Sequence, residues 1–373
     1  MNSSLKTFFE NKKLISKILV ILFNSMGDVL MISPIFETLK KSYPNASLYF
    51  LSTKEFSEII TEHPFIDHFI YYAFNHKNEY FFNPYNMIKM IFKIRKMKYD
   101  IIIDAQSALD SRLITMFSAS KCRIGRARHR LEKKIYFYRI LLNKIYYNIS
   151  VDYKPIKFDY TFDYKPETYL AYQNFDLLKP LKINPEVPRF YINISNDSQS
   201  YIDCWLESIG LKQSCFVVIS PGTKKFKKWK TENFAVLGDL IYIKYGLKTV
   251  LTHANQKEKM CCHNVYDMME TKPFISVETD IFQALALIKR AELLICNDQG
   301  LLHASCGVGV KTIAIFGPTY PPIFSPAAVF KTHHHLYSET YKNKKDNTFG
   351  ITPSDVINTI DKFFLNKEGL NLK

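Results

Sequence analysis

The sequence predicts an α/β protein of two Rossmann-like domains, each built on a parallel sheet, and three observations support this prediction. The chain has 373 residues, more than the roughly 100–200 of one typical domain. Short apolar runs alternate with segments of helical periodicity, as in right-handed βαβ units. An irregular stretch with three prolines, 180–196, divides this series. We therefore expect domains at 1–185 and 186–373 that face a central cleft.

The first half begins with a continuous apolar strand, Ile18–Phe23, followed by a helix at Val29–Lys41. Further strands are expected at Leu48–Leu51, Asp67–Tyr72 and Ile101–Ile103, and further helices near Glu55–Thr61 and at Met87–Lys98. Residues 123–165 break the alternation with a dense mixture of Arg, Lys and Tyr. This region is either a solvated basic helix or an acceptor-side surface that meets phosphates and lipid headgroups.

The second half repeats the alternation of strands and helices. Strands are expected at Phe216–Ser220, Lys248–Thr252, Leu293–Cys296 and Thr312–Phe316. Helices are expected at Glu232–Tyr245, Gln256–Met269, Ile281–Arg290 and from about Gly300. A last helix, Ser354–Leu365, begins after Thr352-Pro353, a helix-start signal, and could pack back on the first domain.

The composition indicates the chemical class of the binding partner and the cellular compartment of the protein. Lys+Arg number 50 and Asp+Glu 35, a net charge of +15, which favours nucleic acid, a phosphorylated saccharide or an anionic membrane face. None of the seven cysteines lies in a C-x-x-C pair, and Cys215, Cys296 and Cys306 are expected to be buried, reduced thiols of a cytosolic protein. No apolar run approaches the ~20 residues of a spanning helix. We expect a cytoplasmic protein whose membrane contact is at most peripheral.

The first candidate motif is Asn24-Ser25-Met26-Gly27-Asp28, between the first strand and the first helix. Ligands of open α/β sheets bind outside the carboxyl ends of the strands. Gly27 would permit a tight turn, and Asp28 would project toward the crevice from the helix start. Asp28 is therefore either a catalytic carboxylate or only the N-cap of that helix.

The second motif, 220–229, follows the first strand of the second half and reads Ser-Pro-Gly-Thr-Lys-Lys-Phe-Lys-Lys-Trp. Backbone N–H groups, the Thr223 hydroxyl and four lysines, Lys227 among them, suit a diphosphate. The alternative is a solvated basic loop before a helix.

The third motif, Asn297 to Ser305, follows the strand at Leu293–Cys296. Gly300 opens a helix whose N-terminal N–H groups can hold an anion. His303, one turn later, would face the same side as Asp298, although a single histidine is more often a packed structural residue. No Asp-x-Asp motif is present to hold a metal, and the run His333–His335 is expected to lie in a loop without function.

At these residues the sequence resembles glycosyltransferase family 9, the bacterial ADP-heptose:lipopolysaccharide heptosyltransferases. The matching segments run from Lys17 to Thr319 and include all three motifs, together with Ser33-Pro34, Ile101–Asp104, Arg123-Ile-Gly125 and Phe316–Thr319. The resemblance implies the GT-B architecture, with the acceptor bound mainly by the first domain and the nucleotide sugar by the second. It implies an inverting glycosyltransferase without a resident cofactor or metal, whose co-substrate is a nucleotide-diphosphate sugar, namely ADP-heptose.

The resemblance also implies roles for individual residues. Asp28 would be the general base; the acceptor side would include Ser25, Gly27, Arg126 and Arg128. Thr223 and Lys227 would hold the diphosphate, Glu258 the ribose, and Asp298 the donor sugar. Gly300 would bind phosphate through its backbone, with Gln299 and His303 beside it. Gln299 stands where the family usually has a small hydroxyl residue, and Asn24 where many members have Arg.

The resemblance implies a phosphorylated glycolipid acceptor, with peripheral contact at the inner face of the cytoplasmic membrane, and no nucleic acid. Two alternatives stay open. A basic nucleic-acid- or membrane-binding protein would explain the charge but not the three turns at strand ends. A sugar-nucleotide epimerase of GT-B architecture would need further acid and base carboxylates, of which the sequence presents no clear set.

Overall fold

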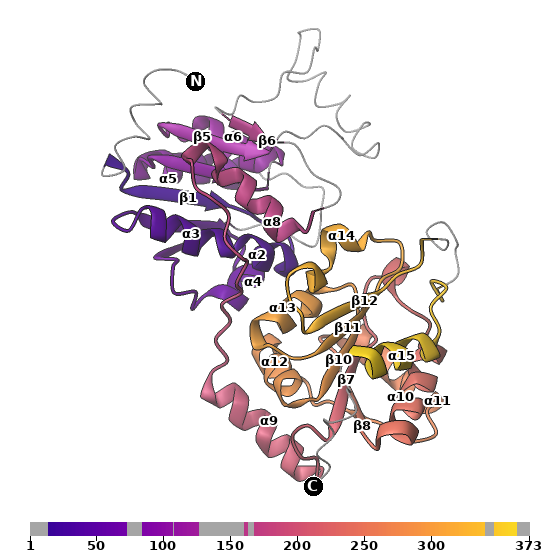
Figure 1. The fold of residues 1–373 in the computed structure, drawn as a ribbon. Coiled ribbons are helices and arrows are strands. Elements are labelled where there is room, and N and C mark those ends of the chain that lie inside the picture. Colours follow the sequence, from indigo (N-terminus) through magenta and orange to yellow (C-terminus); the bar gives the residue numbers. More distant parts are fainter. Residues whose placement is uncertain are drawn as a thin grey trace. The chain divides into compact units, whose positions relative to one another are not determined.

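The computed structural model describes residues 14–72, 84–106, 108–126, 160–162, 168–339 and 347–363. The chain forms two compact units, here called the first and second domains (Figure 1). The first domain comprises Met1–Pro166 and Ala171–Val187, and the second comprises Glu167–Leu170 and Pro188–Lys373. Each contains a six-stranded sheet, and all the strand pairs are parallel, which confirms the predicted fold class.

The sheet of the first domain has the strand order β3-β2-β1-β4-β5-β6. Its strands are β1 (Lys17–Ile21), β2 (Ser47–Ser52), β3 (His68–Tyr71), β4 (Ile101–Asp104), β5 (Cys122–Arg126) and β6 (Tyr160–Phe162). The first four match predicted strands. The start of the basic region 123–165 belongs to strand β5, so a helix is the wrong interpretation there, and most of the rest of that region lies outside the described residues. In β5, Cys122 and Ile124 are buried, whereas Arg123 and Arg126 are partly exposed.

The helices of the first domain lie between these strands or follow the last of them. They are α2 (Met26–Ile32), α3 (Pro34–Ser42), α4 (Lys54–Ser57), α5 (Pro84–Met97), α6 (Leu109–Phe117) and α8 (Leu170–Phe175), with 3-10 turns at Glu58–Ile60 and Asp176–Leu181. The single helix predicted at Val29–Lys41 is two helices. Pro34 has no N–H to donate to Leu30, so the helix breaks there. The Ser33 hydroxyl donates to the Leu30 carbonyl instead, at 2.9 Å.

The sheet of the second domain has the strand order β12-β11-β10-β7-β8-β9. Its strands are β7 (Phe216–Ser220), β8 (Lys248–Leu251), β9 (Phe274–Ile275), β10 (Leu293–Asn297), β11 (Thr312–Ile315) and β12 (His333–Leu336). The histidine run is therefore an edge strand and not a loop. His333 is 1% exposed, and burial lowers its pKa to about 3, so it serves as a neutral core residue.

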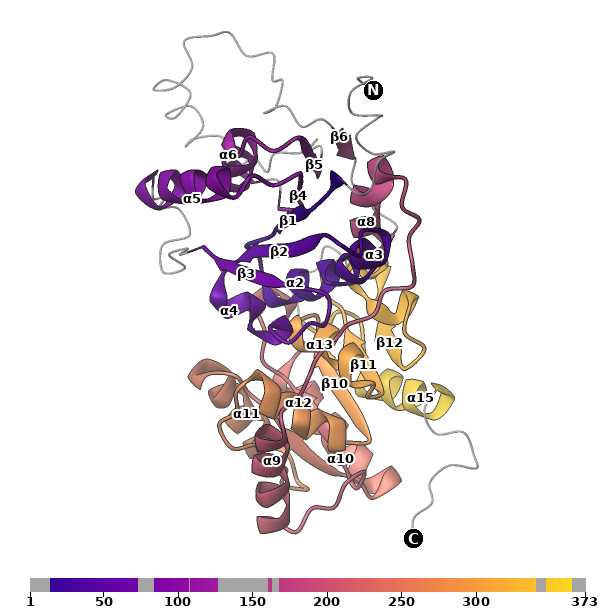
Figure 2. The same cartoon turned by 90° about the vertical axis from the view of Figure 1, so that its left-hand side faces the viewer.

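The helices of the second domain lie on both faces of its sheet (Figure 2). They are α9 (Asn196–Ser208), α10 (Thr231–Tyr245), α11 (Gln256–Met268), α12 (Ile281–Arg290), α13 (Gly300–Val308), α14 (Pro321–Phe324) and α15 (Pro353–Phe363), with 3-10 turns at Lys225–Lys227 and Pro326–Ala328. Helix α9 was not predicted, and it packs beside α12. None of the described helices combines the length and the apolar character needed to cross a bilayer.

The apolar face of α15 packs against α10 within the second domain, where Val356, Ile357 and Ile360 join the core. This face of α15 is thus part of the core of the second domain. Among the three cysteines expected to be buried, Cys296 and Cys306 are buried, but Cys215 is exposed because it precedes the buried part of β7.

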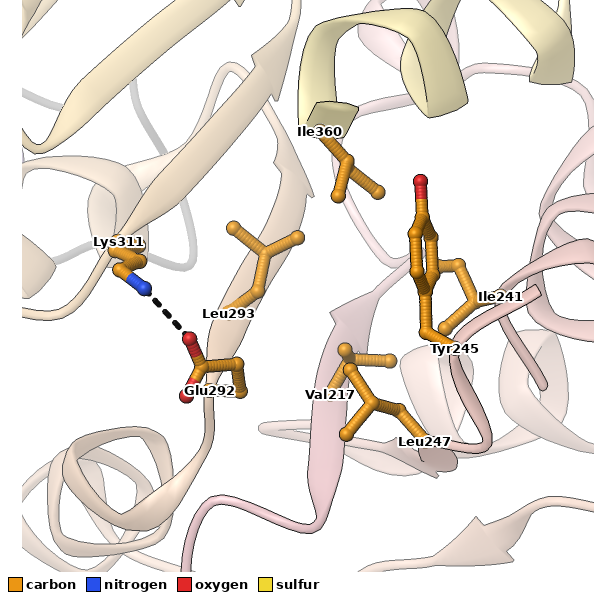
Figure 3. A pocket seen from close by; sticks show the side chains of 8 residues that line it. All are labelled: Val217, Ile241, Tyr245, Leu247, Glu292, Leu293, Lys311 and Ile360. Carbon is orange, nitrogen blue, oxygen red and sulfur yellow. Dashed lines mark hydrogen bonds and ion pairs between the residues drawn. The ribbon is translucent and has the colours of Figure 1, made fainter. Parts of the chain in front are cut away.

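A small pocket lies between α10 and α15, at the edge where the strands of the second sheet begin (Figure 3). Apolar side chains line most of it, and an ion pair between Lys311 and Glu292, 2.6 Å long, lies at its side. Its volume of about 10 Å³ is at the limit for one water molecule. The pocket is therefore a packing defect of the core, at the sheet edge opposite to the one where α/β proteins bind ligands.

Candidate functional site

The second and third sequence motifs meet at the carboxyl edge of the second sheet. Strands β7 and β10 are parallel neighbours, with Ser220 paired to Cys296. The loop after Ser220 and the turn after Asn297 therefore leave the sheet side by side. This is the edge at which open α/β sheets bind ligands.

Asn297 joins the two motifs. It is completely buried, its Oδ1 accepts the Trp229 backbone N–H at 3.0 Å, and its Nδ2 donates to the Pro221 carbonyl at 3.0 Å. Both ends of the Pro221–Trp229 loop are thereby fixed to the end of β10. The sequence motif contained Asn297, but its anchoring role was not predicted, because a buried amide is recognised only once its two partners are known.

Lys227 and Asp298 form an ion pair at this edge, with 2.5 Å between Nζ and Oδ2. Asp298 is 4% exposed, so burial in a medium of low dielectric strengthens its attraction for the ammonium group. The Thr223 hydroxyl donates to the Asp298 backbone carbonyl at 3.4 Å. The structure therefore brings together three of the predicted residues, with the cation held over the sheet edge by a carboxylate. The alternative of a freely solvated basic loop is wrong for Lys227.

Helix α13 begins beside this ion pair. Its N-cap, Gln299, makes no capping hydrogen bond with its side chain, because the side-chain amide donates to the Ser220 hydroxyl at 2.8 Å. Among the described residues, the first N–H groups of the helix, beginning at Gly300, thus have no side-chain acceptor. Such groups, with the positive end of the helix dipole, attract an anion.

His303 lies one turn into α13 and is 4% exposed. Its Nδ1 lies 3.4 Å from the hydroxyl of Tyr169, and the two rings are stacked with 6.4 Å between centroids. Burial raises the pKa of Tyr169 well above its ordinary value, so this hydroxyl keeps its proton. His303 is therefore packed and oriented by a neighbour from the short Glu167–Leu170 segment of the same domain, which the sequence did not reveal.

Glu258 comes to the same edge from the start of α11. Its Oε2 accepts the Ala254 backbone N–H at 2.9 Å, and its own N–H donates to Oδ1 of the N-cap Asn255 at 3.0 Å. Its side chain lies directly on Gly222, where an added Cβ would come within 2.4 Å of the Glu258 Cγ. Gly222 is thus required by close approach of a side chain, and the structure places the predicted ribose carboxylate beside the predicted phosphate loop.

Asp28 lies at the carboxyl edge of the first sheet, in the first turn of α2. Ser25 is the N-cap of this helix, so Asp28 itself is not the N-cap. The Asp28 Oδ2 accepts hydrogen bonds from Asn24 Nδ2, at 2.6 Å, and from Ser25 Oγ, at 2.7 Å. Asp28 is partly exposed, so a reactant can reach the carboxylate.

Gly27 does not form the tight turn that we expected. It lies inside the first turn of α2, is buried, and is not among the glycines with positive φ. The loop before it is held by Gln106, whose side-chain carbonyl accepts the Phe23 N–H at 3.0 Å. Gln106 follows β4, the neighbour of β1, and only this strand order makes its role visible.

Of the two arginines predicted on the acceptor side, Arg126 is among the described residues. Arg126 ends β5 and donates to the Asn174 side-chain carbonyl at 2.6 Å, while the Asn174 amide donates to the Met31 carbonyl in α2 at 2.6 Å. Arg126 thus braces the helix that carries Asp28. Arg128 lies outside the described residues. Within the described part of the chain, no cluster of three or more His, Cys, Asp or Glu side chains could hold a metal ion.

A family model described as glycosyltransferase family 9 (heptosyltransferase) matches residues 87–350, which span both domains. The chain belongs to glycosyltransferase family 9. It is therefore a glycosyltransferase of GT-B architecture, and the alternatives of a purely nucleic-acid- or membrane-binding protein and of an epimerase are set aside.

Relatives of this family 9 enzyme cover most of the chain. It is 25% identical over 309 residues to lipopolysaccharide heptosyltransferase 3 of Escherichia coli K12, covering 79% of this chain and 80% of the relative. It is 22% identical over 316 residues to lipooligosaccharide heptosyltransferase 2 of Haemophilus influenzae, covering 83% and 85%.

Solved structures of similar fold include a family 9 glycosyl transferase from Veillonella parvula, with a TM-score of 0.75 and 19% identity, covering 94% of this chain and 97% of that one. The ADP-heptose LPS heptosyltransferase II of Escherichia coli matches with a TM-score of 0.68 and 19% identity, covering 93% and 98%. At this identity the solved structures establish the fold of the family 9 enzyme.

Proposed function

We propose that this family 9 enzyme transfers a heptose from an ADP-sugar to the core of a lipopolysaccharide or lipooligosaccharide precursor, with inversion and without a metal. The names of the relatives support the heptosyl donor and the glycolipid acceptor. One observation in the second domain supports the binding of the nucleotide-sugar donor. The N-terminus of α13 has no side-chain cap from Gln299 and lies beside Lys227, so it can bind an anion.

The donor diphosphate would bind at the start of α13. Backbone N–H groups from Gly300 onward, the Thr223 hydroxyl and the Lys227 ammonium supply donors to its oxygens. On binding, Lys227 would turn from Asp298 toward the diphosphate, which leaves Asp298 to accept a hydroxyl of the donor sugar. Glu258 would accept from the ribose, and His303 would contact the phosphates in the orientation set by Tyr169.

The transfer step would use Asp28 as the base. The acceptor oxygen attacks the anomeric carbon, its proton passes to Asp28, and the bond from the anomeric carbon to the diphosphate oxygen breaks, releasing ADP. Attack on the face opposite the leaving group inverts the anomeric centre. Negative charge grows on the diphosphate as that bond lengthens, so cationic and N–H donors there act more strongly in the transition state than before it.

Gln299 affects donor recognition. Where the family usually has a small hydroxyl residue, the longer amide reaches back to Ser220, and so it holds α13 against β7 instead of capping the helix. We propose that this arrangement exposes more backbone N–H groups to the diphosphate than a hydroxyl cap would. The role of Arg126 and Arg128 in holding an acidic acceptor is part of the same proposal.

Donor binding tests the proposal directly. ADP and ADP-heptose at about 100 times their Kd should raise the Tm of the second domain by roughly 5–10 °C, whereas UDP-sugars should shift it much less. Transfer to a purified inner-core acceptor, read by mass spectrometry, should add one heptose. A protein stabilised by UDP-sugars and not by ADP-sugars would contradict the donor assignment, and addition of a hexose would contradict the sugar.

Gly222→Ala should weaken ADP-sugar binding by about tenfold or more, because the added methyl group would force the Glu258 side chain out of its place. Isothermal titration with ADP measures the effect. Glu258→Gly is the partner variant: since it removes both the Cγ and the Cβ, which would lie 2.4 Å and 2.9 Å from the added methyl group, adding Gly222→Ala to it should cause little further loss. Two fully additive losses would show that Gly222 acts on the donor independently of Glu258.

A further inference from the structure

Helix α5 presents an exposed face on which large apolar side chains and cations occur together. Tyr85, Ile88 and Phe92 are 73%, 49% and 68% exposed. They recur at spacings of three and four residues, which places them on one face of the helix, while Met87, Met90 and Ile94 hold the opposite face in the core. Solvent-exposed side chains of this size in a stripe on one helix indicate an interaction surface.

The cations of α5 flank this apolar stripe. Lys89, Lys93, Arg95 and Lys96 are all exposed, and the segment from Pro84 to Met97 contains no acidic residue. Among the ion pairs of the described residues, none involves Lys89, Lys93 or Lys96. The face thus carries a local positive charge that its own helix leaves uncompensated.

The end of helix α6 extends the same surface. Met116 and Phe117 are 42% and 45% exposed, and α6 packs beside α5 (Figure 2). Arg95 donates to the Phe117 carbonyl at 3.2 Å, and Arg123 donates to the Met116 carbonyl at 3.4 Å. These bonds hold two guanidinium groups next to the exposed apolar side chains. The α5–α6 face is defined here as these residues together with the exposed stripe and lysines of α5.

The exposed apolar residue Ile243 of α10 has different surroundings. On α10, Ile243 is 74% exposed, but its neighbour Lys244 is paired with Asp361 in α15 at 2.5 Å. A compensated charge of this kind offers little attraction for an anionic partner. The combination of a large apolar stripe with uncompensated cations therefore distinguishes the α5–α6 face from α10.

We propose that the α5–α6 face docks the first domain on an anionic lipid surface, with Tyr85, Ile88 and Phe92 entering the headgroup layer and the lysines contacting lipid phosphates. A helix with an apolar stripe between basic residues lies in the plane of a membrane interface in this way. Aromatic rings with a polar edge suit this depth. The inference rests on the proposed function for its purpose, since a glycolipid acceptor is presented at such a surface.

Vesicle flotation with the full chain tests the docking without any transfer reaction. The protein should bind vesicles of phosphatidylcholine mixed with phosphatidylglycerol and bind pure phosphatidylcholine vesicles much more weakly. The triple variant Lys89→Gln/Lys93→Gln/Lys96→Gln should lose at least about tenfold in affinity for the anionic vesicles, since each lysine near such a surface contributes roughly fivefold. The double variant Ile88→Ser/Phe92→Ser should also bind severalfold more weakly, and this loss should persist at high salt.

A matched control removes the same charge elsewhere. Lys54→Gln/Lys212→Gln/Lys331→Gln changes three exposed lysines outside the α5–α6 face and should keep most of the vesicle affinity. Equal losses in the two triple variants, or equal binding to neutral and anionic vesicles, would overturn the proposal.

The outcome is separable from the proposed function. Both α5 variants should transfer sugar normally to an acceptor dispersed in detergent, because they lie outside the donor site and the Asp28 turn. If the unchanged protein transfers sugar but binds no vesicles, the docking surface is refuted and the proposed function is not. Vesicle binding that depends on α5, in a protein that transfers nothing, would leave the docking standing and refute the function.

Discussion

Asp28→Asn should lower the rate of transfer by at least 10²–10⁴-fold, on the scale of general-base catalysis, while the affinity for ADP-sugar stays unchanged. The amide has nearly the same shape as the carboxylate, and its oxygen can still accept from Asn24 and Ser25, so the first turn of α2 should keep its geometry. It cannot take up the proton of the acceptor hydroxyl. The measurement is single-turnover transfer at saturating donor and acceptor.

The control for Asp28→Asn is Asp197→Asn, which makes the same change in the first turn of α9, where the acid is exposed and away from either candidate site. This variant should transfer at the normal rate. Normal transfer by Asp28→Asn would show that another group is the base. Loss of donor binding together with transfer would show that Asp28 acts through the structure of the donor site.

Lys227→Ala should weaken donor binding and slow transfer together, with a loss of roughly 10²–10³-fold in the rate, the scale seen when one group that stabilises developing charge is removed. The ammonium group is the cation that the structure holds at the uncapped start of α13. Donor titration and steady-state kinetics measure the two effects. Lys225→Ala, in the same 3-10 turn but exposed, should change neither by more than about twofold.

Lys227→Ala also leaves the buried Asp298 without its cation, which lowers stability as well as activity. The double variant Lys227→Ala/Asp298→Asn removes this unpaired charge. Thermal unfolding should recover in the double variant, while donor binding should not. Recovery of binding along with stability would mean that Lys227 only holds the loop in shape.

Elements with a strong local signal were predictable from the sequence. The apolar runs at β1, β7 and β10 match the observed strands within a residue or two, because a buried parallel strand must be apolar along its length. Elements were missed where the local pattern was weak or misleading. The three histidines of β12 are polar in free solution, yet all three pair with β11, where His333 is buried, His334 partly buried and His335 exposed.

Candidate site residues were found where a motif follows a strand, and missed where the role depends on distant partners. Thr223, Lys227, Asp298 and Gly300 follow two strands that the sequence already marked. Asn297, Gln106 and Tyr169 act through residues more than 65 positions away in the sequence. Periodicity describes near neighbours only, so such pairs become visible when the strand order is known.

The second and third motifs, at the carboxyl edge of the second sheet, separate what the sequence determines from what the structure adds. By itself the sequence determined two α/β domains, the strand ends that carry Asp28, Thr223 and Asp298, and a basic chain suited to an anionic substrate. The tertiary structure alone decided that Lys227 is held by Asp298, that Gln299 leaves α13 without a side-chain cap, and that Gly222 makes room for Glu258. The reason is physical: the pattern of apolar residues specifies which segments are buried, whereas the partner of a polar side chain depends on which strands lie next to each other.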